Sequence, residues 1–494
     1  MSEKKENLID VVIGAISPKW AYERAMYRFG LGQVKSYDAA RVDRLQPWTP
    51  VNATAEQTDS PHRDILRARA RDLERNSDIA ASAIGAIIRN VVGTGIHPQA
   101  RIKKANGEFD EKLNRELEQA WKQWAGKTNC DITGQQTFYE LQSTFLRRRV
   151  VDGEVLAHLV IDRSAEIPLK IQGIEVDLLD TGKQIGQNGN IVASGVEIDA
   201  YYKPLAYWLQ SASLDGFVTV DSRRISADRI LHLFNKWRFT QVRGISELAQ
   251  VMRRMKETGE YLDAELVAAK IAASFALFVK RQMPGMSVGR LPQDSEGNRV
   301  DTIAPGMIEY LNPGEDITTA APGRNATTAK DFIEIESRMA AAGLGLSYEV
   351  LSRDMSQSTY SSARQNHLED RRTFAPMQQY MITHFCQPVW KEFVTACVLS
   401  GVVNIPGFFS DPEKYLETTW IAPGWAWIDP LKDVKASIEE MNAGLNTLAD
   451  IAAEQGKDWQ ELLDQRAREL EYAKKLGLKP EEKGAGNGGS GTSK

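Results

Sequence analysis

The sequence has few cysteines and no paired cysteine spacing, which excludes a disulfide framework. Its three cysteines, Cys130, Cys386 and Cys397, are an odd number. On one helix Cys386 and Cys397 would lie roughly 16 Å apart at 1.5 Å per residue, too far for a disulfide bond. We expect reduced, buried thiols.

Long apolar runs are also missing. The run Ile271 to Val279 is far shorter than the roughly 20 residues that cross a bilayer. Near the N-terminus, Asp10 interrupts the apolar stretch Leu8 to Ile16, and Glu3 and Glu6 precede it, which argues against a signal peptide. We expect no membrane contact, and a protein that stays in the cytoplasm where it is made.

The chain has no excess of basic residues. Its 61 basic and 66 acidic residues give a formal charge of -5, whereas proteins that grip nucleic acid usually show a large basic surplus. Any contact with DNA is therefore expected to be weak or local. The 494 residues, 42% of them hydrophobic, suffice for two or three domains.

Motifs of enzyme chemistry are absent from the sequence. The six histidines are scattered, and there is no HExxH, CxxC, Walker A or GxSxG pattern. Gly93 and Gly95 suggest a phosphate loop, but Pro98 stands where a third glycine would be, so a helix cap is favoured. Adjacent acidic pairs such as Glu369-Asp370 favour a solvated surface. We expect no catalytic residue, no metal and no cofactor, and a protein that is not an enzyme.

The most strongly patterned stretch runs from about Thr327 to Gly401. A helical segment at 329–342 enters a glycine turn, and a longer helical run extends from Ser361 to about Ser400. Between them, five serine and threonine residues in the ten positions 352–361 predict an exposed loop with an N-cap at its far end. Apolar residues at steps of three or four in the longer run predict one buried stripe: Phe374, Met377, Met381, Phe385, Val389, Phe393 and Cys397.

Short β-type runs lie in the first half of the chain, with helical patterns at His62–Val92 and Asp110–Trp124 before them. Together with the helices that follow, they predict an α+β fold. The runs are Glu154–Ile161, Leu169–Val176, Ala206–Leu209, Phe217–Val220 and Ile230–Phe234. The first helical pattern carries five arginines: Arg63, Arg67, Arg69, Arg71 and Arg75. We favour a solvated helix face for them, and a subunit or nucleic-acid contact is the alternative.

A second long helix is predicted from Ile245 to Lys280, about 54 Å at 1.5 Å per residue. Its small and apolar residues alternate steps of four and three, as in a heptad seam. We favour packing of this seam against copies of itself over packing within its own subunit. A Gly/Pro-rich insert with one strand at Gly306–Leu311 occupies 283–324.

The two ends of the chain differ from the middle in composition. Glycines and prolines interrupt the first fifty residues, which predicts an arm rather than a domain. Beyond Gly401, Trp420, Trp425 and Trp427 are expected to rejoin the sheet domain. Helices are expected at 431–442, 447–455 and 459–476, and a disordered tail at 481–494.

Two passages around the polar loop resemble a known family. Gly343-Leu-Gly-Leu-Ser-Tyr-Glu-Val-Leu-Ser-Arg-Asp354 and Ser358-Thr-Tyr-Ser-Ser-Ala-Arg364 resemble the signature of the lambda-type portal proteins of tailed bacteriophages. The resemblance keeps the family's order from about Arg44 to Gly477. Four shorter stretches share in it: Arg69–Asn76, Asn90–Ile96, Asp429–Lys432 and Gly444–Thr447.

This resemblance implies a portal subunit that forms a dodecameric ring at one capsid vertex of the virion, with a central channel for packaging and ejecting double-stranded DNA. Its implied partners are the terminase large subunit, the major capsid or scaffold protein, and the head-completion (adaptor) protein. The implied parts are an N-terminal arm (1–60), a wing (61–244 and 402–430), stem helices (245–280 and 327–351), a clip (281–326), a tunnel loop (352–361), a tunnel helix (362–401), crown helices (431–480) and a tail (481–494).

Three sets of residues are candidates for the work of such a ring. The tunnel-loop set is Ser352, Arg353, Asp354, Met355, Ser356, Gln357, Ser358, Thr359, Tyr360 and Ser361. The stem self-packing set is Leu248, Met252, Met255, Leu262, Leu266, Ala269 and Ala273. Arg364, His367 and Arg371, at i, i+3 and i+7, form either a charged solvent face or, as our hypothesis, a sequence-independent contact with DNA phosphates in the channel.

Two other functions remain open at this point. One is a ring- or clamp-like DNA-processing accessory protein or enzyme, which would need a carboxylate-held metal that the sequence does not offer. The other is an intracellular scaffold or adaptor that assembles through the heptad seam. Twelve copies at -5 would carry a formal charge of -60, and such a ring would repel DNA on average and let it slide.

Overall fold

The computed structural model describes residues 52–212, 218–273, 277–280, 308–311, 326–425 and 430–476. The chain divides into two units, Met1–Thr54 and Ala55–Lys494, and the second contains nearly all of the described residues. The expected arm lies mostly outside the described residues, as do Trp427, most of the expected clip and the expected tail. A helix already begins at Ala55, within the range expected for the arm.

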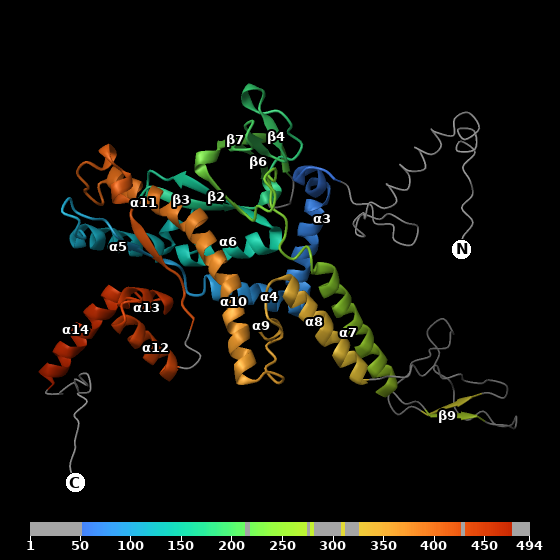
Figure 1. The fold of residues 1–494 in the computed structure, drawn as a ribbon. Helices are drawn as coiled ribbons and strands as arrows, with labels where there is room; N and C mark the ends of the chain where they lie inside the picture. Colours follow the sequence, from blue (N-terminus) through green and yellow to red (C-terminus); the bar gives the residue numbers. More distant parts are fainter. Residues whose placement is uncertain are drawn as a thin grey trace, which may run out of the picture. The chain divides into compact units, whose positions relative to one another are not determined.

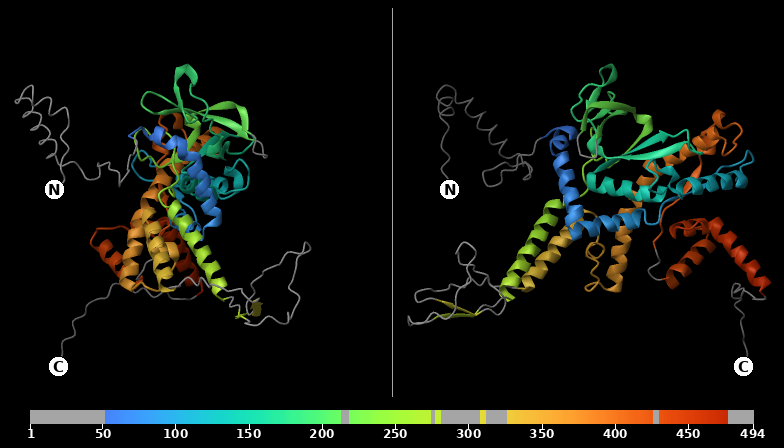
Figure 2. Two further views of the ribbon diagram at one scale, coloured as in Figure 1. Left: turned by 90° about the vertical axis from the view of Figure 1, so that its right-hand side faces the viewer. Right: turned by 180° about the vertical axis from the view of Figure 1, so that it is seen from behind.

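Among the described residues, four α-helices precede the main sheets (Figures 1 and 2). They are α3 (Ala55–Asn76), α4 (Asp78–Val91), α5 (Glu111–Ala125) and α6 (Phe138–Asp152). The sequence predicted the region of the first three but not the fourth. Ser77 separates the first two as the N-cap of α4, where its side chain accepts a hydrogen bond from the Ala80 N–H. The left-handed Gly93 follows α4, which agrees with the predicted helix cap.

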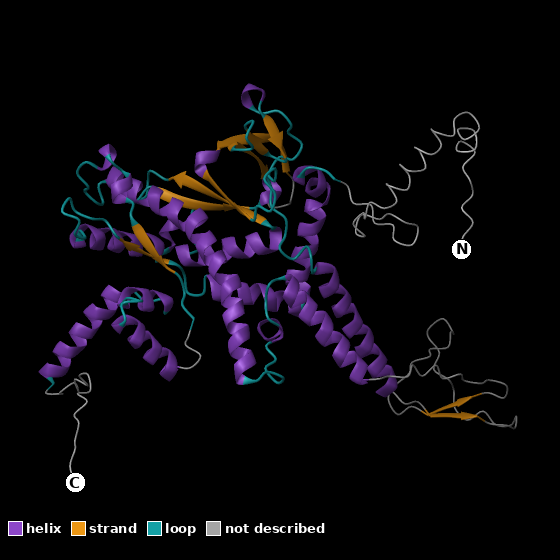
Figure 3. Ribbon diagram, viewed as in Figure 1, coloured by secondary structure: helices purple, strands orange, loops and turns teal. Residues whose placement is uncertain are grey.

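The strands between α6 and α7 form two antiparallel sheets (Figure 3). One has three strands in the order β3-β2-β8: β2 (Glu154–Ile161), β3 (Leu169–Ile174) and β8 (Ile230–Phe234). The other has the order β4-β5-β6-β7: β4 (Ile191–Ala193), β5 (Val196–Ile198), β6 (Pro204–Ala212) and β7 (Val218–Ser226). Each of the five predicted runs coincides with a strand or overlaps one, and the α+β class is confirmed.

The tryptophan-rich segment after Gly401 does not rejoin either of these sheets. Its strand β11 (Thr418–Ile421) pairs antiparallel with β1 (His97–Ala100) in a separate two-stranded sheet. Trp420 instead contributes to an aromatic cluster with Trp121 and Trp390. The segment therefore returns to residues within 61–244, in line with the expectation, but it does so through β1 and Trp121 and not through the two larger sheets. The apolar rings specified burial but not the strand's partner.

The predicted helix from Ile245 to Lys280 is too long at both ends. Helix α7 spans Met252–Ala273, about 33 Å at 1.5 Å per residue, and Leu277–Lys280 form strand β9, which pairs parallel with β10 (Ile308–Leu311). Before Met252 the chain turns, because the Glu247 N–H donates to the Val150 carbonyl and Leu248 is buried. The apolar run Leu277-Phe278-Val279 suits a strand as well as a helix.

Helix α8 (Ala326–Gly343) leads through the left-handed Gly345 to a short helix α9 (Tyr348–Ser352), which the sequence analysis missed. The expected loop follows, and then come α10 (Tyr360–Met381), a π-helical turn (Ile382–Cys386) and α11 (Gln387–Ser400). Pro388 has no N–H to continue the regular ladder, which accounts for a break at this place. Six residues of the predicted stripe are buried, and Met377 packs against them.

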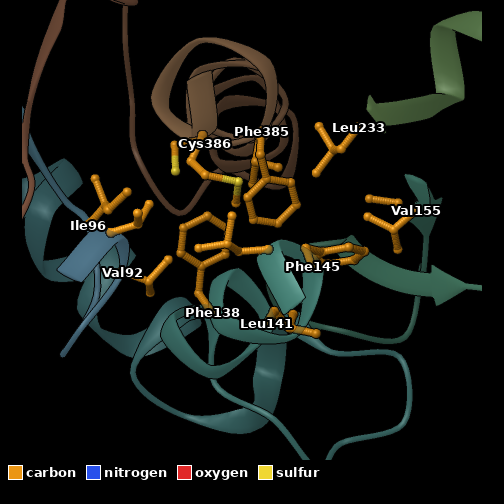
Figure 4. Close-up of a cluster of buried hydrophobic side chains, with 14 of the residues drawn as sticks. Val92, Ile96, Phe138, Leu141, Phe145, Val155, Leu233, Phe385 and Cys386 are labelled. Carbon is orange, nitrogen blue, oxygen red and sulfur yellow. The ribbon is translucent and has the colours of Figure 1, made fainter. Parts of the chain in front are cut away.

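The buried stripe of α10 and α11 lies on α6 (Figure 4). Phe385 stacks on Phe138 with ring centres 5.4 Å apart and planes 8° apart, and it also contacts Phe145 at 4.8 Å. The buried Gln142 side chain hydrogen-bonds both the N–H and the carbonyl of Ile96. This packing fixes the helix that follows the polar loop to the rest of the core.

Three helices end the described chain, as predicted: α12 (Pro430–Asn442), α13 (Leu448–Glu454) and α14 (Trp459–Lys475). Helix α14 has no buried residue and is held to α5 by an ion pair between Lys122 and Glu461, 2.8 Å. Within the part of the chain that the structure describes, no helix could span a membrane.

Candidate functional site: the paired stem helices and the polar loop

Helices α7 and α8 lie side by side (Figure 2). The rings of Tyr261 and Phe332 meet edge to face at 4.9 Å, and Arg254 forms an ion pair with Glu336 at 2.5 Å. Gly343 at the end of α8 leaves no room for a side chain, since a Cβ there would collide with Val251. The two helices therefore form one body.

The heptad seam of α7 divides into a buried and an exposed half. Leu248, Met252 and Met255 are buried within the chain itself, so these members of the expected self-packing set are not free to contact another copy. Further along, Leu262 is 37% and Leu266 is 54% exposed. Ala269 is half-buried, and α7 ends at Ala273.

Helix α8 presents a second exposed apolar stripe. Phe332, Ile335 and Met339 follow each other at steps of three and four and so share one face of the helix. Ile335 is 58% exposed. We call Leu262, Leu266, Phe332, Ile335 and Met339 the stem face.

The polar loop connects helices α9 and α10, and hydrogen bonds hold both of its ends. At the N-terminus of α9, the carboxylate of Asp370 accepts hydrogen bonds from both the N–H and the hydroxyl of Ser347, each 2.7 Å. At the far side of the loop, Ser358 donates to Glu349 at 2.8 Å. Burial raises the pKa of Asp370, although its bonds to Ser347 act in the opposite direction. The loop is thus fixed at both ends to α9 and α10.

The loop's own backbone is ordered by local hydrogen bonds. Arg353 takes a left-handed conformation (φ 58°) as the cap of α9, and the Asp354 carboxylate accepts from the Ser356 N–H, which lowers the pKa of Asp354. Thr359 is the N-cap of α10 in a reciprocal capping box with Ser362. Nine of the ten residues 352–361 are exposed, and Ser358 is half-buried. The predicted exposed loop with a cap at its far end is confirmed.

The structure does not support an outward-facing basic stripe of Arg364, His367 and Arg371. Arg364 lies 3.5 Å from Asp433 of α12, and the Arg371 guanidinium lies 5.7 Å from the ring centre of Trp425. Burial lowers the pKa of Arg371. Only His367 is exposed. Helical spacing placed these side chains on one face but could not show that the C-terminal segment covers it.

Arginines of α3 also form ion pairs within the chain. Arg63 pairs with Glu56 at 3.0 Å and Arg67 with Asp177 at 3.1 Å, both arginines being buried. Arg71 donates to Asp152 at 2.8 Å and to Asp177, and these bonds raise its pKa. The favoured solvated face was wrong for these three, and only Arg69 and Arg75 are exposed. Their acidic partners are distant in sequence, so no local pattern revealed them.

A second buried ionic network joins the two sheets. Glu154 at the start of β2 accepts from Arg243 Nε at 2.8 Å and from the Gly244 N–H at 2.9 Å, and it lies 2.9 Å from His232 Nε2. Arg243 also donates to the carbonyl of Ser194, between β4 and β5. Burial alone would raise the pKa of Glu154, but the Arg243 charge and the His232 bond hold it well below its usual value.

Sequence comparison identifies the relatives of this chain. The profile described as phage portal protein, lambda family, matches residues 41–378. The probable portal protein of Halomonas phage phiHAP-1 is 29% identical over 456 residues, covering 90% of this chain and 88% of that protein. Portal protein B of Escherichia phage lambda is 25% identical over 482 residues, covering 88% of this chain and 89% of that protein.

Structural comparison gives a weaker likeness. The chain resembles a subunit from the neck of a native GTA particle, computed with C12 symmetry, with a TM-score of 0.42 and 11% identity. The match covers 81% of this chain and 99% of that one.

Proposed function

We propose, because this chain belongs to the lambda family of phage portal proteins, that twelve copies form a closed ring at one vertex of a phage capsid. The ring would be the channel through which double-stranded DNA is packaged and ejected. It would act as a structural part of the virion rather than as an enzyme.

The observation that carries the ring is the stem face. Burying an exposed leucine, isoleucine, phenylalanine or methionine side chain fully is worth roughly 1.5–3 kcal/mol, and the five residues of the stem face are 37% to 58% exposed. Exposed apolar side chains gathered on a pair of packed helices are typical of an interaction site. A ring of head-to-tail contacts would cover the stem face of every copy without leaving a free end.

The family's parts are assigned to this chain by their order. Helices α7 and α8 would be the stem, and the insert between them would be the clip that meets the terminase large subunit and later the head-completion protein. The two sheets with α3 to α6 would be the wing, in contact with the major capsid or scaffold protein. Residues 352–361 would be the tunnel loop, α10 and α11 the tunnel helix, and α12 to α14 the crown.

The first test is the mass and axial appearance of the purified chain, from native mass spectrometry and negative-stain imaging. We expect a closed ring of twelve copies of 55.1 kDa, about 660 kDa, with a central hole. A chain that stays monomeric or dimeric at high concentration would contradict the ring. A ring without an axial opening would contradict the channel.

A further inference from the structure

One face of α4 points toward the start of the polar loop. Ser82, Gly85 and Arg89 share this face, since they stand at i, i+3 and i+7. The Ser82 hydroxyl donates to the carbonyl of Leu351 in α9 at 2.6 Å. The Arg89 side chain folds back along the helix, so that its guanidinium Nη1 lies 2.8 Å from where a Cβ on Gly85 would be. Gly85 thus leaves space for the guanidinium one turn from the α4–α9 contact.

Arg353 begins the polar loop at the same junction. It lies two residues beyond Leu351, and its N–H donates to the Glu349 carbonyl at 2.8 Å. Its left-handed backbone is a conformation that residues other than glycine adopt at some cost. Arg89 and Arg353 are both exposed. The fold therefore brings two arginines from distant parts of the sequence to one place on the surface.

These two like charges are not neutralised by the residues that the structure describes. Neither guanidinium forms an ion pair among them. The carboxylates of α9, the polar loop and α10 accept hydrogen bonds from hydroxyl or backbone groups: Glu349 from Ser358, Asp354 from Ser356 and Asp370 from Ser347. Burial and the charge of Arg353 both lower the pKa of Arg89. An arrangement that holds two cations together, with no described acid in an ion pair with either, is suited to an anion from outside the chain.

We propose that Arg89 and Arg353 form a phosphate-binding site for the DNA backbone at the base of the tunnel loop. This inference rests on the proposed function, because a DNA channel supplies the phosphates. Two guanidinium groups contact phosphate oxygens without reading base sequence. They take the role that the sequence analysis gave to Arg364 and Arg371, which lie against the chain's own C-terminal segment.

The test uses the full chain assembled as rings, with a short double-stranded DNA of mixed sequence as the probe. Binding is followed by fluorescence anisotropy over a range of salt concentrations, for the wild type and for Arg89→Gln, Arg353→Gln and the double variant. Each lost phosphate contact should lower the slope of log affinity against log salt by about 0.9. Arg69→Gln, which removes an exposed arginine of α3, is the matched control and should bind like the wild type.

A second variant leaves all charges in place. Gly85→Ala puts a methyl group 2.8 Å from the Arg89 Nη1. This is too close for a normal contact, so the substitution should displace the guanidinium and weaken DNA binding while α4 remains helical. Double-variant rings that bind DNA with the wild-type affinity and salt slope would overturn the inference and leave the proposed ring and channel intact. Double-variant chains that fold but no longer form rings would also overturn it, because the arginines would then pair with an acid of a neighbouring copy. Wild-type chains that form no ring would instead contradict the proposed function.

Discussion

Replacing Glu154 by glutamine should destabilise the fold by about 3–5 kcal/mol, the usual result of breaking one side of a buried ion pair. The side chains of Glu154 and Arg243 are 0% and 1% exposed. Removing the carboxylate's charge leaves the guanidinium of Arg243 buried beside a neutral amide. Water cannot reach that charge to compensate, so the loss approaches the full penalty for an unpaired buried charge.

An exposed pair provides the matched control. Arg253 and Glu257 form an i,i+4 pair at 2.7 Å on α7, with side chains 88% and 58% exposed. Glu257→Gln makes the same chemical change, yet it should cost far less stability than Glu154→Gln because water solvates the arginine that remains. The contrast isolates burial as the cause.

The assay is urea unfolding followed by tryptophan fluorescence, at concentrations where the chain is monomeric. Because the pKa of Glu154 is held below its ordinary value, its contribution is present above about pH 4.5 and is lost as the pH falls further. The difference between wild type and Glu154→Gln should therefore be constant near neutral pH and shrink in acid. A difference below about 1 kcal/mol at pH 7 would refute the argument from burial.

Three other predictions concern the stem face, a glycine and the thiols. Ile335→Glu should weaken ring formation by at least tenfold per contact, since a buried charge replaces an apolar contact. Native mass spectrometry would then show species smaller than the ring. An unchanged ring would show that Ile335 does not lie in the interface. Gly153→Ala should lower the free energy of unfolding much more than Gly107→Ala in the same assay. Both glycines have φ near 90°, but only at Gly153 would a Cβ collide with backbone atoms, those of Ile245 and Ser246. The thiols of Cys130, Cys386 and Cys397 are buried, and burial raises their pKa values, to about 12 for Cys130 and Cys397; mass spectrometry after iodoacetamide should find none alkylated in the native chain and all three in urea.

Local pattern was enough to predict most helices and strands. The stripe from Phe374 to Cys397 repeats at helical spacing over more than six turns, and the run Glu154–Ile161 is a strand with the predicted bounds. Such signals are strong because one face of each element must be apolar for the chain to have a core. The first and last residues of α7 were predicted wrongly because the same small and apolar residues suit a helix, a turn or a strand. Contacts with α6 and β10 decide which of these structures forms at each end.

Charged side chains were the least predictable part of the candidate site. Arg67 and Arg71 pair with Asp177, more than a hundred residues away, and Arg364 pairs with Asp433. Helical spacing shows which arginines share a face but does not show what covers that face. For the same reason no sequence pattern indicates Arg89, which we propose as a phosphate contact because it lies close to Arg353.

The division of the α7 seam near Thr258 explains how one heptad pattern can serve two purposes. Up to Met255 the seam lies in the subunit's own core, and there a polar substitution should prevent folding. From Leu262 onward its larger residues are exposed, together with Phe332, Ile335 and Met339 of α8. A polar substitution in this second half should leave the monomer folded and affect assembly alone. The proposed ring needs such a division, because each subunit must fold before it meets its neighbours and must still carry apolar surface for them to cover.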